Sequence, residues 1–209
     1  MYTLHYWPDS ASLIIRLILD ELGLPYTLRK IDRAAGALNS PDYRALNPLG
    51  QIPALETPDG PMFETAAILV YLTERHPGLA PAPGDADRAA FLKWLFFTSS
   101  NLQPAMLQLY YPERTAGPDN SAAVVAHAAA RLTDLLAILE AANPRVLSAT
   151  TPTALGYYLA VLMRWIAKDI PSRTYPNLHA MLTFLETRPA AIAAAEAESL
   201  GVKFFSDPD

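Results

Sequence analysis

The sequence predicts a chain of two parts, an α/β part followed by an all-helical part. Strand and helix patterns alternate up to about residue 75, which is typical of α/β proteins. From residue 86 onward every strong hydrophobic pattern has the helical period. Between them, segment 76–84 contains too much proline and glycine for a regular element. We therefore expect the boundary between the two parts in this segment.

The chain opens with a β-α-β unit. Thr3–Tyr6 alternates weakly as a strand, and Ser12–Leu22 has the pattern of a helix that Gly23 ends. Pro25–Ile31 reads as a second strand, and the right-handed crossover makes the two strands parallel. The next segment, Arg33–Ala45, has no clear pattern.

A proline then stands inside the apolar strand pattern Gln51–Leu55. Proline removes a backbone donor and cannot serve a central strand, so Pro53 marks an edge, a bend or a cis peptide. The backbone groups of Ile52 are then left unpaired, and an extended peptide ligand can bind them. A turn at 58–61 leads into a hairpin partner at Pro61–Phe63.

The helix Ala66–Arg75 closes the first part, and Glu64 and Thr65 stand at its entrance. The first turn of a helix has backbone N–H groups without partners inside the helix. Such a helix start is a binding site for a carboxylate.

The second part is predicted to consist of helices joined by short loops. The helical period covers five segments: Ala86–Tyr111 with a kink at Pro104, Ser121–Ala142, Thr153–Lys168, Leu178–Thr187 and Ala190–Ser199.

Composition narrows the classes of function. The 209 residues carry a net charge of −5 without a basic stripe, so nucleic acid is not expected as a partner. The 51% share of hydrophobic residues is high for a soluble domain and suggests a subunit interface. Zero cysteines exclude disulfides, thiolate metal sites and chemistry by a protein thiol. The four histidines lack metal-ligand spacing, so we expect no metal.

No membrane association is expected. Two long stretches without charge, Trp94–Pro112 and Val146–Met163, contain polar residues that fit buried helices better than membrane spans. The amino terminus lacks a basic stretch followed by an apolar run, as a signal peptide would have. We expect a soluble, cytoplasmic protein.

Three motifs resemble those of one family. They are YWPDSASLIIRLILDELGLPY, NPLGQIPAL and FETAAILVYL, and in this order and spacing they resemble the soluble, bacterial-type glutathione transferases, of the serine type or unclassified. The resemblance implies a thioredoxin-like glutathione-binding domain over 1–77, a linker over 78–84 and an all-helical domain over 85–209. It also implies a homodimer that uses glutathione as co-substrate.

Glutathione chemistry requires a donor that stabilises the thiolate, because the thiol is the weak form of the nucleophile. Ser10 and Ser12 stand at the start of the first helix, and Tyr6 ends the first strand. Pro8-Asp9-Ser10 resembles the Pro-Gly-Ser of the serine-type classes with Asp in place of Gly, so Ser10 is the first candidate and Ser12 and Tyr6 are the alternatives. A plain role of Ser10 as helix cap is compatible with this assignment.

The resemblance also assigns the ligand contacts. Glu64 and Thr65 match the residues that hold the γ-glutamyl amine and carboxylate of glutathione. Ile52 and Pro53 match the positions whose backbone pairs with the cysteinyl part, with Pro53 expected in cis, and Gln51 adds a side-chain contact. The electrophile is expected between the domains, against residues without a catalytic role: Trp7, Gln103, Met106, Leu107, Tyr110 and Tyr111.

The function implied is a glutathione transferase that activates the thiol for attack on small hydrophobic electrophiles. The alternatives on the same fold are a glutathione-dependent isomerase, dehalogenase, peroxidase or lyase. From another class, a non-catalytic binding or adaptor protein would keep the fold. Two departures from the family pattern are Asp9 and Gly156, the latter standing where the family has an acid that caps its central buried helix.

Overall fold

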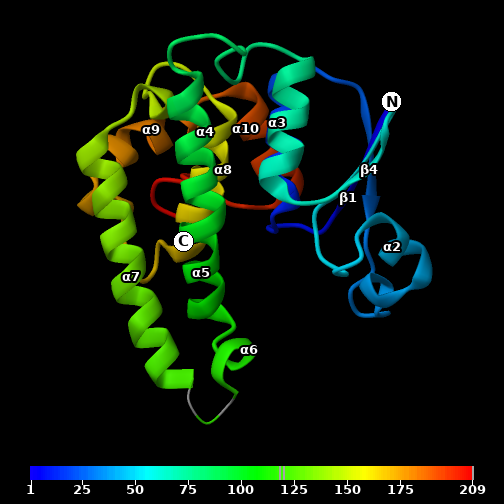
Figure 1. Cartoon of the computed structure of the whole chain (residues 1–209), viewed down its shortest axis with the longest axis horizontal. Coiled ribbons are helices and arrows are strands. Elements are labelled where there is room, and N and C mark those ends of the chain that lie inside the picture. Colours follow the sequence, from blue (N-terminus) through cyan, green and yellow to red (C-terminus); the bar gives the residue numbers. More distant parts are fainter. Residues whose placement is uncertain (118, 120, 209) are drawn as a thin grey trace.

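The first part of the chain folds around a four-stranded sheet. The computed structural model describes residues 1–117, 119 and 121–208, and Figure 1 shows the strands at one end of the molecule and the long helices at the other. The sheet has the order β2-β1-β3-β4. Its strands are β1 (Tyr2–Tyr6), β2 (Tyr26–Lys30), β3 (Ala54–Thr57) and β4 (Gly60–Met62). β1 pairs parallel with β2 and antiparallel with β3, and β4 pairs antiparallel with β3. The predicted β-α-β unit and hairpin are confirmed.

Helix α1 (Ser12–Glu21) fills the space between the sheet and the helical part. It packs on β1 and on α3 (Thr65–Arg75), and also on helices α8 (Ala154–Ile166) and α10 (Pro189–Glu198) of the second part. Its apolar side chains are fully buried from Leu13 to Leu19, apart from the half-buried Arg16. One continuous hydrophobic core therefore joins both parts, so the start of α1 is held from two sides.

The opposite face of the sheet carries a helix that sequence reasoning missed. Segment 33–45, which had no clear pattern, contains a 3-10 turn (Ala37–Asn39) and helix α2 (Pro41–Leu46). The Ser40 side chain caps α2 by accepting the N–H of Tyr43, and a proline stands in its first turn. This Ser-Pro start was the available signal. Tyr43 packs from α2 against Ile31 and Ala54, in a small cluster of its own.

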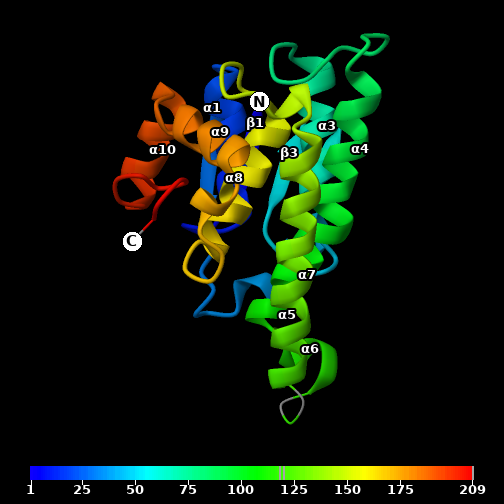
Figure 2. The same cartoon turned by 90° about the vertical axis from the view of Figure 1, so that its left-hand side faces the viewer.

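The second part is a bundle of helices. The bounds are α4 (Arg88–Phe97), α5 (Gln103–Tyr110), α6 (Glu113–Ala116), α7 (Ser121–Ala142), α8 (Ala154–Ile166), α9 (Pro176–Glu186) and α10 (Pro189–Glu198). α5 and α7 pack side by side and extend to α6 at the far end of the molecule (Figures 1 and 2). α8 is buried along its whole apolar length at the centre. The fold predicted from the sequence, a thioredoxin-like domain followed by an all-helical domain, is confirmed.

The long helix predicted at Ala86–Tyr111 is interrupted by more than a kink. A π-helical segment, η2 (Thr98–Leu102), separates α4 from α5. Pro104 lies in the first turn of α5, where a missing N–H costs least. The interruption therefore precedes the proline. It sets the direction of α5 relative to α4.

The backbone N–H groups at the start of α8 have hydrogen-bond acceptors, although the acid of the family pattern is replaced by Gly156. The Thr153 hydroxyl accepts the N–H of Gly156 at 3.0 Å, and the Ala154 N–H donates to the Leu79 carbonyl at 2.8 Å. A Cβ added to Gly156 would lie 3.3 Å from Thr153 Oγ1 and in ordinary van der Waals contact, at 3.5 and 3.6 Å, with Leu185 Cδ1 and Met181 Sδ on α9. A side chain here would therefore press first on the capping hydroxyl of Thr153.

Thr153→Ala is expected to lower the free energy of unfolding by about 1 kcal/mol, because it removes this cap. Urea denaturation monitored by circular dichroism measures the change. Thr183→Ala is the control, because Thr183 is exposed on α9 and its hydroxyl only bonds back to its own helix. A loss for Thr153→Ala no larger than that of the control would contradict the capping role.

One helix of the described residues is long and apolar enough to cross a membrane by length and composition. It is α7, Ser121–Ala142. Core helices of soluble proteins pass the same test, so the feature is weak evidence. In the described structure, the two stretches considered in the sequence, Trp94–Pro112 and Val146–Met163, do not form helices long and apolar enough to cross a membrane.

Candidate active site

A cleft of about 830 Å³ opens between the two domains. Its N-terminal side is formed by the start of α1 and by the loop before β3, and its C-terminal side by α5, α6 and the end of α8. Of the predicted site residues, Ser10, Gln51 and Ile52 line this cleft. The others, Tyr6, Ser12, Pro53, Glu64 and Thr65, do not form part of its lining among the described residues.

The hydroxyls of Ser10 and Ser12 share one backbone carbonyl. Ser10 Oγ donates to the Trp7 carbonyl at 2.7 Å, and Ser12 Oγ lies 3.2 Å from the same oxygen. The two hydroxyl oxygens are 2.9 Å apart. Ser10 is half-buried and faces the cleft, whereas Ser12 is completely buried and also accepts the Trp7 N–H at 3.3 Å. Tyr6 is half-buried and does not reach the cleft lining.

Ser10 is not the helix cap that the alternative interpretation expected. The residue before α1 is Ala11, which has no capping side chain. Ser10 Oγ accepts only a long hydrogen bond of 3.3 Å from the Ser12 N–H, while its backbone carbonyl accepts the Leu13 N–H at 2.9 Å. The main partner of the Ser10 hydroxyl is therefore the Trp7 carbonyl, and the O–H must turn away from this carbonyl to donate to a ligand in the cleft.

The loop before β3 presents an open stretch of backbone. The Ile52–Pro53 bond is cis, as the sequence predicted. β3 begins at Ala54, so the strand expected from Gln51 is shorter than predicted, because the cis proline turns the chain out of the ladder. The Gln51 carbonyl is taken by Tyr43 Oη at 2.7 Å and Asn47 Nδ2 at 2.8 Å. Within the described residues, the backbone groups of Ile52 have no hydrogen-bond partner.

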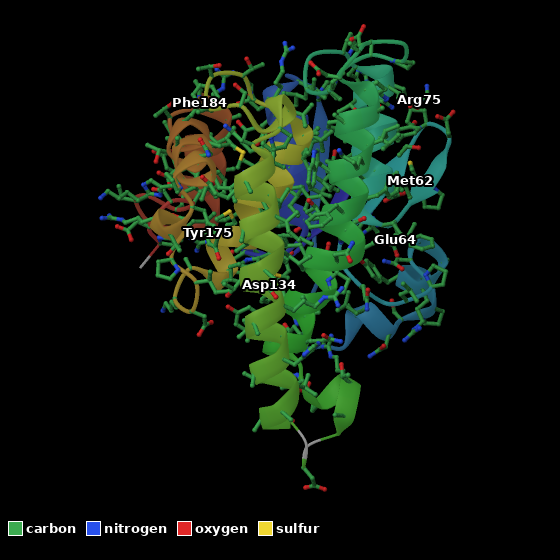
Figure 3. All side chains as sticks on the ribbon, turned by 60° about the vertical axis from the view of Figure 1, so that its left-hand side comes forward. Met62, Glu64, Arg75, Asp134, Tyr175 and Phe184 are labelled. Atoms are coloured by element: carbon green, nitrogen blue, oxygen red, sulfur yellow. The ribbon has the colours of Figure 1, made fainter. Side chains whose placement is uncertain are left out.

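Glu64 and Thr65 stand at the start of α3. Thr65 is the first residue of the helix and is buried, while Glu64 is exposed and has a φ of 71°. A positive φ is costly for a residue with a long side chain, and such strain clusters at ligand sites. Figure 3 shows Glu64 on the side of the N-terminal domain that faces the long helices.

Glu64 also lies close to the wall of the cleft formed by α5 and α8. Burial chiefly, and then the charge of Glu64, raises the pKa of Tyr158 on α8. The Tyr158 hydroxyl donates to the side-chain oxygen of Gln103, which lines the cleft. Glu64 therefore adjoins the cleft through Tyr158 and Gln103, although it is not part of the lining itself.

The helical wall is aromatic and cationic. The predicted wall residues of α5 and its end all line the cleft: Gln103, Met106, Leu107, Tyr110 and Tyr111. Trp7, also predicted there, is not part of the lining. Tyr110 Oη donates to the Trp165 carbonyl at 2.5 Å, and burial, followed by the nearby Asp169, raises its pKa to about 12. The Arg114 guanidinium lies 3.9 Å over the Tyr111 ring.

Sequence reasoning missed the contacts of Asp9. Its carboxylate forms a two-point ion pair with Arg164 on α8 and accepts a hydrogen bond from the indole of Trp165. All three residues line the cleft. These partners are about 155 positions away along the chain, so no local pattern identifies them. Only the substitution of Asp for the usual Gly marked the position.

No metal centre is evident in the part of the chain that the structure describes. Within it, no group of three or more His, Asp or Glu side chains is placed to hold an ion.

Comparison with known proteins supports a single family. The family model "Glutathione S-transferase, N-terminal domain" matches residues 1–74. Glutathione S-transferase 3 of Zea mays is 33% identical over 145 residues, which cover 66% of this chain and 65% of the maize protein. A glutathione S-transferase of Xanthomonas campestris is 30% identical over 169 residues, covering 77% of this chain and 80% of the relative. The chain thus spans slightly less than two thirds of the maize protein's length.

A solved structure extends the match over the whole fold. A sphingomonad glutathione S-transferase, complexed with glutathione, is 32% identical and covers 95% of this chain and all of its own, with a TM-score of 0.79. With the Xanthomonas relative matched over four fifths of its length, both domains are accounted for. The chain therefore belongs to the glutathione S-transferase family.

Proposed function

We propose that this protein is a glutathione transferase that activates the thiol of glutathione for attack on small hydrophobic electrophiles. One observation carries the proposal: the Ser10 hydroxyl and the open backbone of Ile52 line the same interdomain cleft. The Glu64–Thr65 start of α3 is outside this lining, and Glu64 acts on Tyr158, whose hydroxyl donates to the cleft residue Gln103. The sphingomonad relative of the same fold is complexed with glutathione, which supports the same ligand here.

The proposed pose of glutathione follows from these three groups. The backbone of Ile52, next to the cis proline, pairs with the cysteinyl part as an added strand does. The first N–H groups of α3 and the Thr65 hydroxyl take the γ-glutamyl carboxylate, as helix starts take anions. Glu64 accepts the γ-glutamyl ammonium, and the Gln51 side chain adds a polar contact. The sulfur then lies toward the start of α1.

In the proposed reaction, the thiol of glutathione gives its proton to solvent and the thiolate attacks the electrophilic carbon. A carbon–sulfur bond forms while the leaving group departs with its electron pair. The Ser10 hydroxyl stabilises the thiolate by donating to it instead of to the Trp7 carbonyl. Ser10 is favoured over Ser12 and Tyr6 because it alone of the three lines the cleft. The aromatic wall from Met106 to Tyr111 packs against the electrophile.

The alternatives keep the glutathione site and change the chemistry or remove it. An isomerase, dehalogenase, peroxidase or lyase differs in the second substrate, and a binding or adaptor protein lacks turnover. Calorimetric titration with glutathione combined with turnover of 1-chloro-2,4-dinitrobenzene tests the transferase. Binding with turnover supports it. Binding without turnover on a panel of aryl and alkyl halides contradicts the transferase and the dehalogenase and leaves the isomerase, peroxidase, lyase and non-catalytic alternatives. Absence of glutathione binding contradicts every alternative that uses this site.

We also propose that the protein is a cytoplasmic homodimer. Each chain has one domain at 1–77 and one at 85–209, and a linker at 78–84 joins them. Large apolar side chains outside the cleft remain exposed on one chain, for example Phe96 at 54% and Ile138 at 49%. Contact with a second copy would cover such groups.

Light scattering at micromolar concentration is expected to give twice the chain mass of 22.8 kDa. Phe96→Ser tests whether the exposed ring contributes, since burial of an aromatic side chain is a main source of interface energy. The control is Val202→Ser, another exposed apolar residue, near the C-terminus. A monomeric mass for the parent would contradict the dimer.

A further inference from the structure

We propose that Arg164 and Glu198 of the helical domain hold the loop that carries Ser10 in its working geometry, and that they do so through Asp9. Asp9, Arg164 and Glu198 are thus positioning residues, and the helical domain sets how well the Ser10 hydroxyl meets the sulfur. The inference rests on the proposed function for its chemical consequence, but its structural part can be judged without glutathione.

The backbone of Asp9 is strained and is held at its N–H. Its φ is 49°, in the left-handed region that residues with a side chain rarely occupy. Asp and Asn tolerate this region better than other residues, and strain of this kind persists where the surroundings fix it. The Asp9 N–H donates to Glu198 Oε2 at 2.9 Å. The Glu198 side chain on α10 is only 1% exposed, so this acceptor is itself fixed by packing.

The side chain of Asp9 is held by a second element, α8. Arg164 Nε donates to Asp9 Oδ1 and Arg164 Nη2 to Asp9 Oδ2, both at 3.0 Å. Trp165 Nε1 donates to Oδ1 at 2.9 Å. This two-point guanidinium–carboxylate geometry is the most directional of ion pairs. Arg164 is in turn fixed by the Phe204 carbonyl, which accepts from its Nη1 at 3.0 Å.

Two ion pairs lie around the loop, and each joins one Arg to one carboxylate. Arg16 on α1 lies 3.3 Å from Glu198 Oε1, and Arg164 pairs with Asp9. Burial raises the pKa of Glu198, while the Asp9 N–H and the charge of Arg16 act in the opposite direction. Loss of the Asp9 charge would therefore leave the Arg164 guanidinium, whose side chain is only 13% exposed, without its carboxylate. Loss of Arg164 would leave Asp9, whose side chain is 39% exposed, without the two-point contact that holds it.

The backbone conformation of Asp9 fixes the position of the next residue, Ser10. Ser10 follows Asp9 in the chain, and its hydroxyl and carbonyl are placed by Trp7 and Leu13. A hydrogen bond weakens steeply when its angle departs from linear, and misplacement by about 1 Å can cost about a hundredfold in rate. A glycine at this position would adopt the positive φ without strain. This chain uses a carboxylate that the helical domain can hold.

The test compares Asp9→Asn, Arg164→Met and the double variant with the parent. Asn keeps the shape and the tolerance of positive φ but loses the charge. The control is Arg173→Met, which breaks an exposed, single-contact Arg–Asp pair with Asp207 elsewhere in the helical domain. Three quantities are measured: amide hydrogen exchange of the peptide spanning residues 7–13, kcat and KM for glutathione, and the pH midpoint of the bound thiolate absorbance.

The expected result is faster exchange in residues 9–13 for both single variants, with no such change for the control. We expect kcat to fall about tenfold, KM for glutathione to stay within about twofold and the thiolate midpoint to rise. The double variant should be no worse than the more affected single variant, because both remove the same coupling. Arg164→Lys keeps the positive charge but loses the planar two-point geometry, and it should lie between parent and Arg164→Met.

The outcomes distinguish this inference from the proposed function. Exchange, kcat and thiolate midpoint equal to the parent, with only a lower melting temperature, would overturn it and leave only a structural ion pair. If the parent does not bind glutathione, the proposed function fails, and the exchange measurement still decides whether Arg164 holds the loop.

Discussion

Ser10→Ala is expected to lower turnover with an aryl halide about tenfold to a hundredfold, because it removes about 1.5–3 kcal/mol of hydrogen bonding to the charged sulfur. The affinity for glutathione should barely change, since the rest of the tripeptide is held at Ile52 and at the start of α3. An interaction made mainly with the ionised sulfur affects kcat rather than binding. Steady-state kinetics of the variant against the parent measures this split.

The thiolate itself provides an independent measurement. The ultraviolet absorbance of the thiolate of bound glutathione, followed against pH, should shift to higher pH in Ser10→Ala by about one to two pKa units, because about 1.4 kcal/mol corresponds to one unit. The sign follows from the donor: a hydrogen bond that stabilises the anion lowers the pKa of the thiol, and its removal raises it.

Tyr6→Phe and Ser12→Ala are the controls. Ser12 is fully buried with both Trp7 backbone groups as neighbours, so its loss should reduce the stability of the fold rather than shift the thiolate titration. Tyr6 does not line the cleft. If Ser10→Ala titrates and turns over like the parent while a control loses both, the thiolate donor is that control residue.

The sequence predicted those elements whose signals are local. Gly23 has the positive φ that a helix-ending glycine needs, and α7 has the predicted bounds Ser121–Ala142. The cis bond before Pro53 was also predicted. In each case, the physical cause lies within a few residues: backbone freedom, hydrophobic period or a missing N–H.

Other features could not be predicted because their causes are distant in the chain. The π-helical segment before Gln103 has no residue that demands it, since Pro104 alone would predict a simple kink. Gly156 seemed to weaken the start of α8, but the Thr153 hydroxyl and the distant Leu79 carbonyl accept the N–H groups of this helix start without an acid. Asp9 departs from the Gly of the family pattern, and the sequence alone does not explain it. In the structure, Asp9 is bound by Arg164 and Glu198. Tertiary contacts decide these three positions.

Glu64→Ala is expected to weaken glutathione binding at least about tenfold, because it leaves the ligand's ammonium group without its carboxylate, a loss of about 2 kcal/mol or more. The backbone strain at Glu64, with φ at 71°, is the same for alanine, since both residues have a Cβ. The loss can therefore be assigned to the side chain rather than to the start of α3.

Calorimetric titration with glutathione measures the affinity of each variant. Glu64→Gln keeps the size and polarity of the side chain and removes only the charge, so it should lose most of the same affinity if the ion pair is the cause. Glu196→Ala is the control for a change in net charge, because Glu196 is exposed on α10, away from the cleft lining. It should bind like the parent. Unchanged affinity in Glu64→Ala would remove the proposed glutathione pose, because without an anchor for the γ-glutamyl end the Ile52 backbone alone would not fix the sulfur beside Ser10.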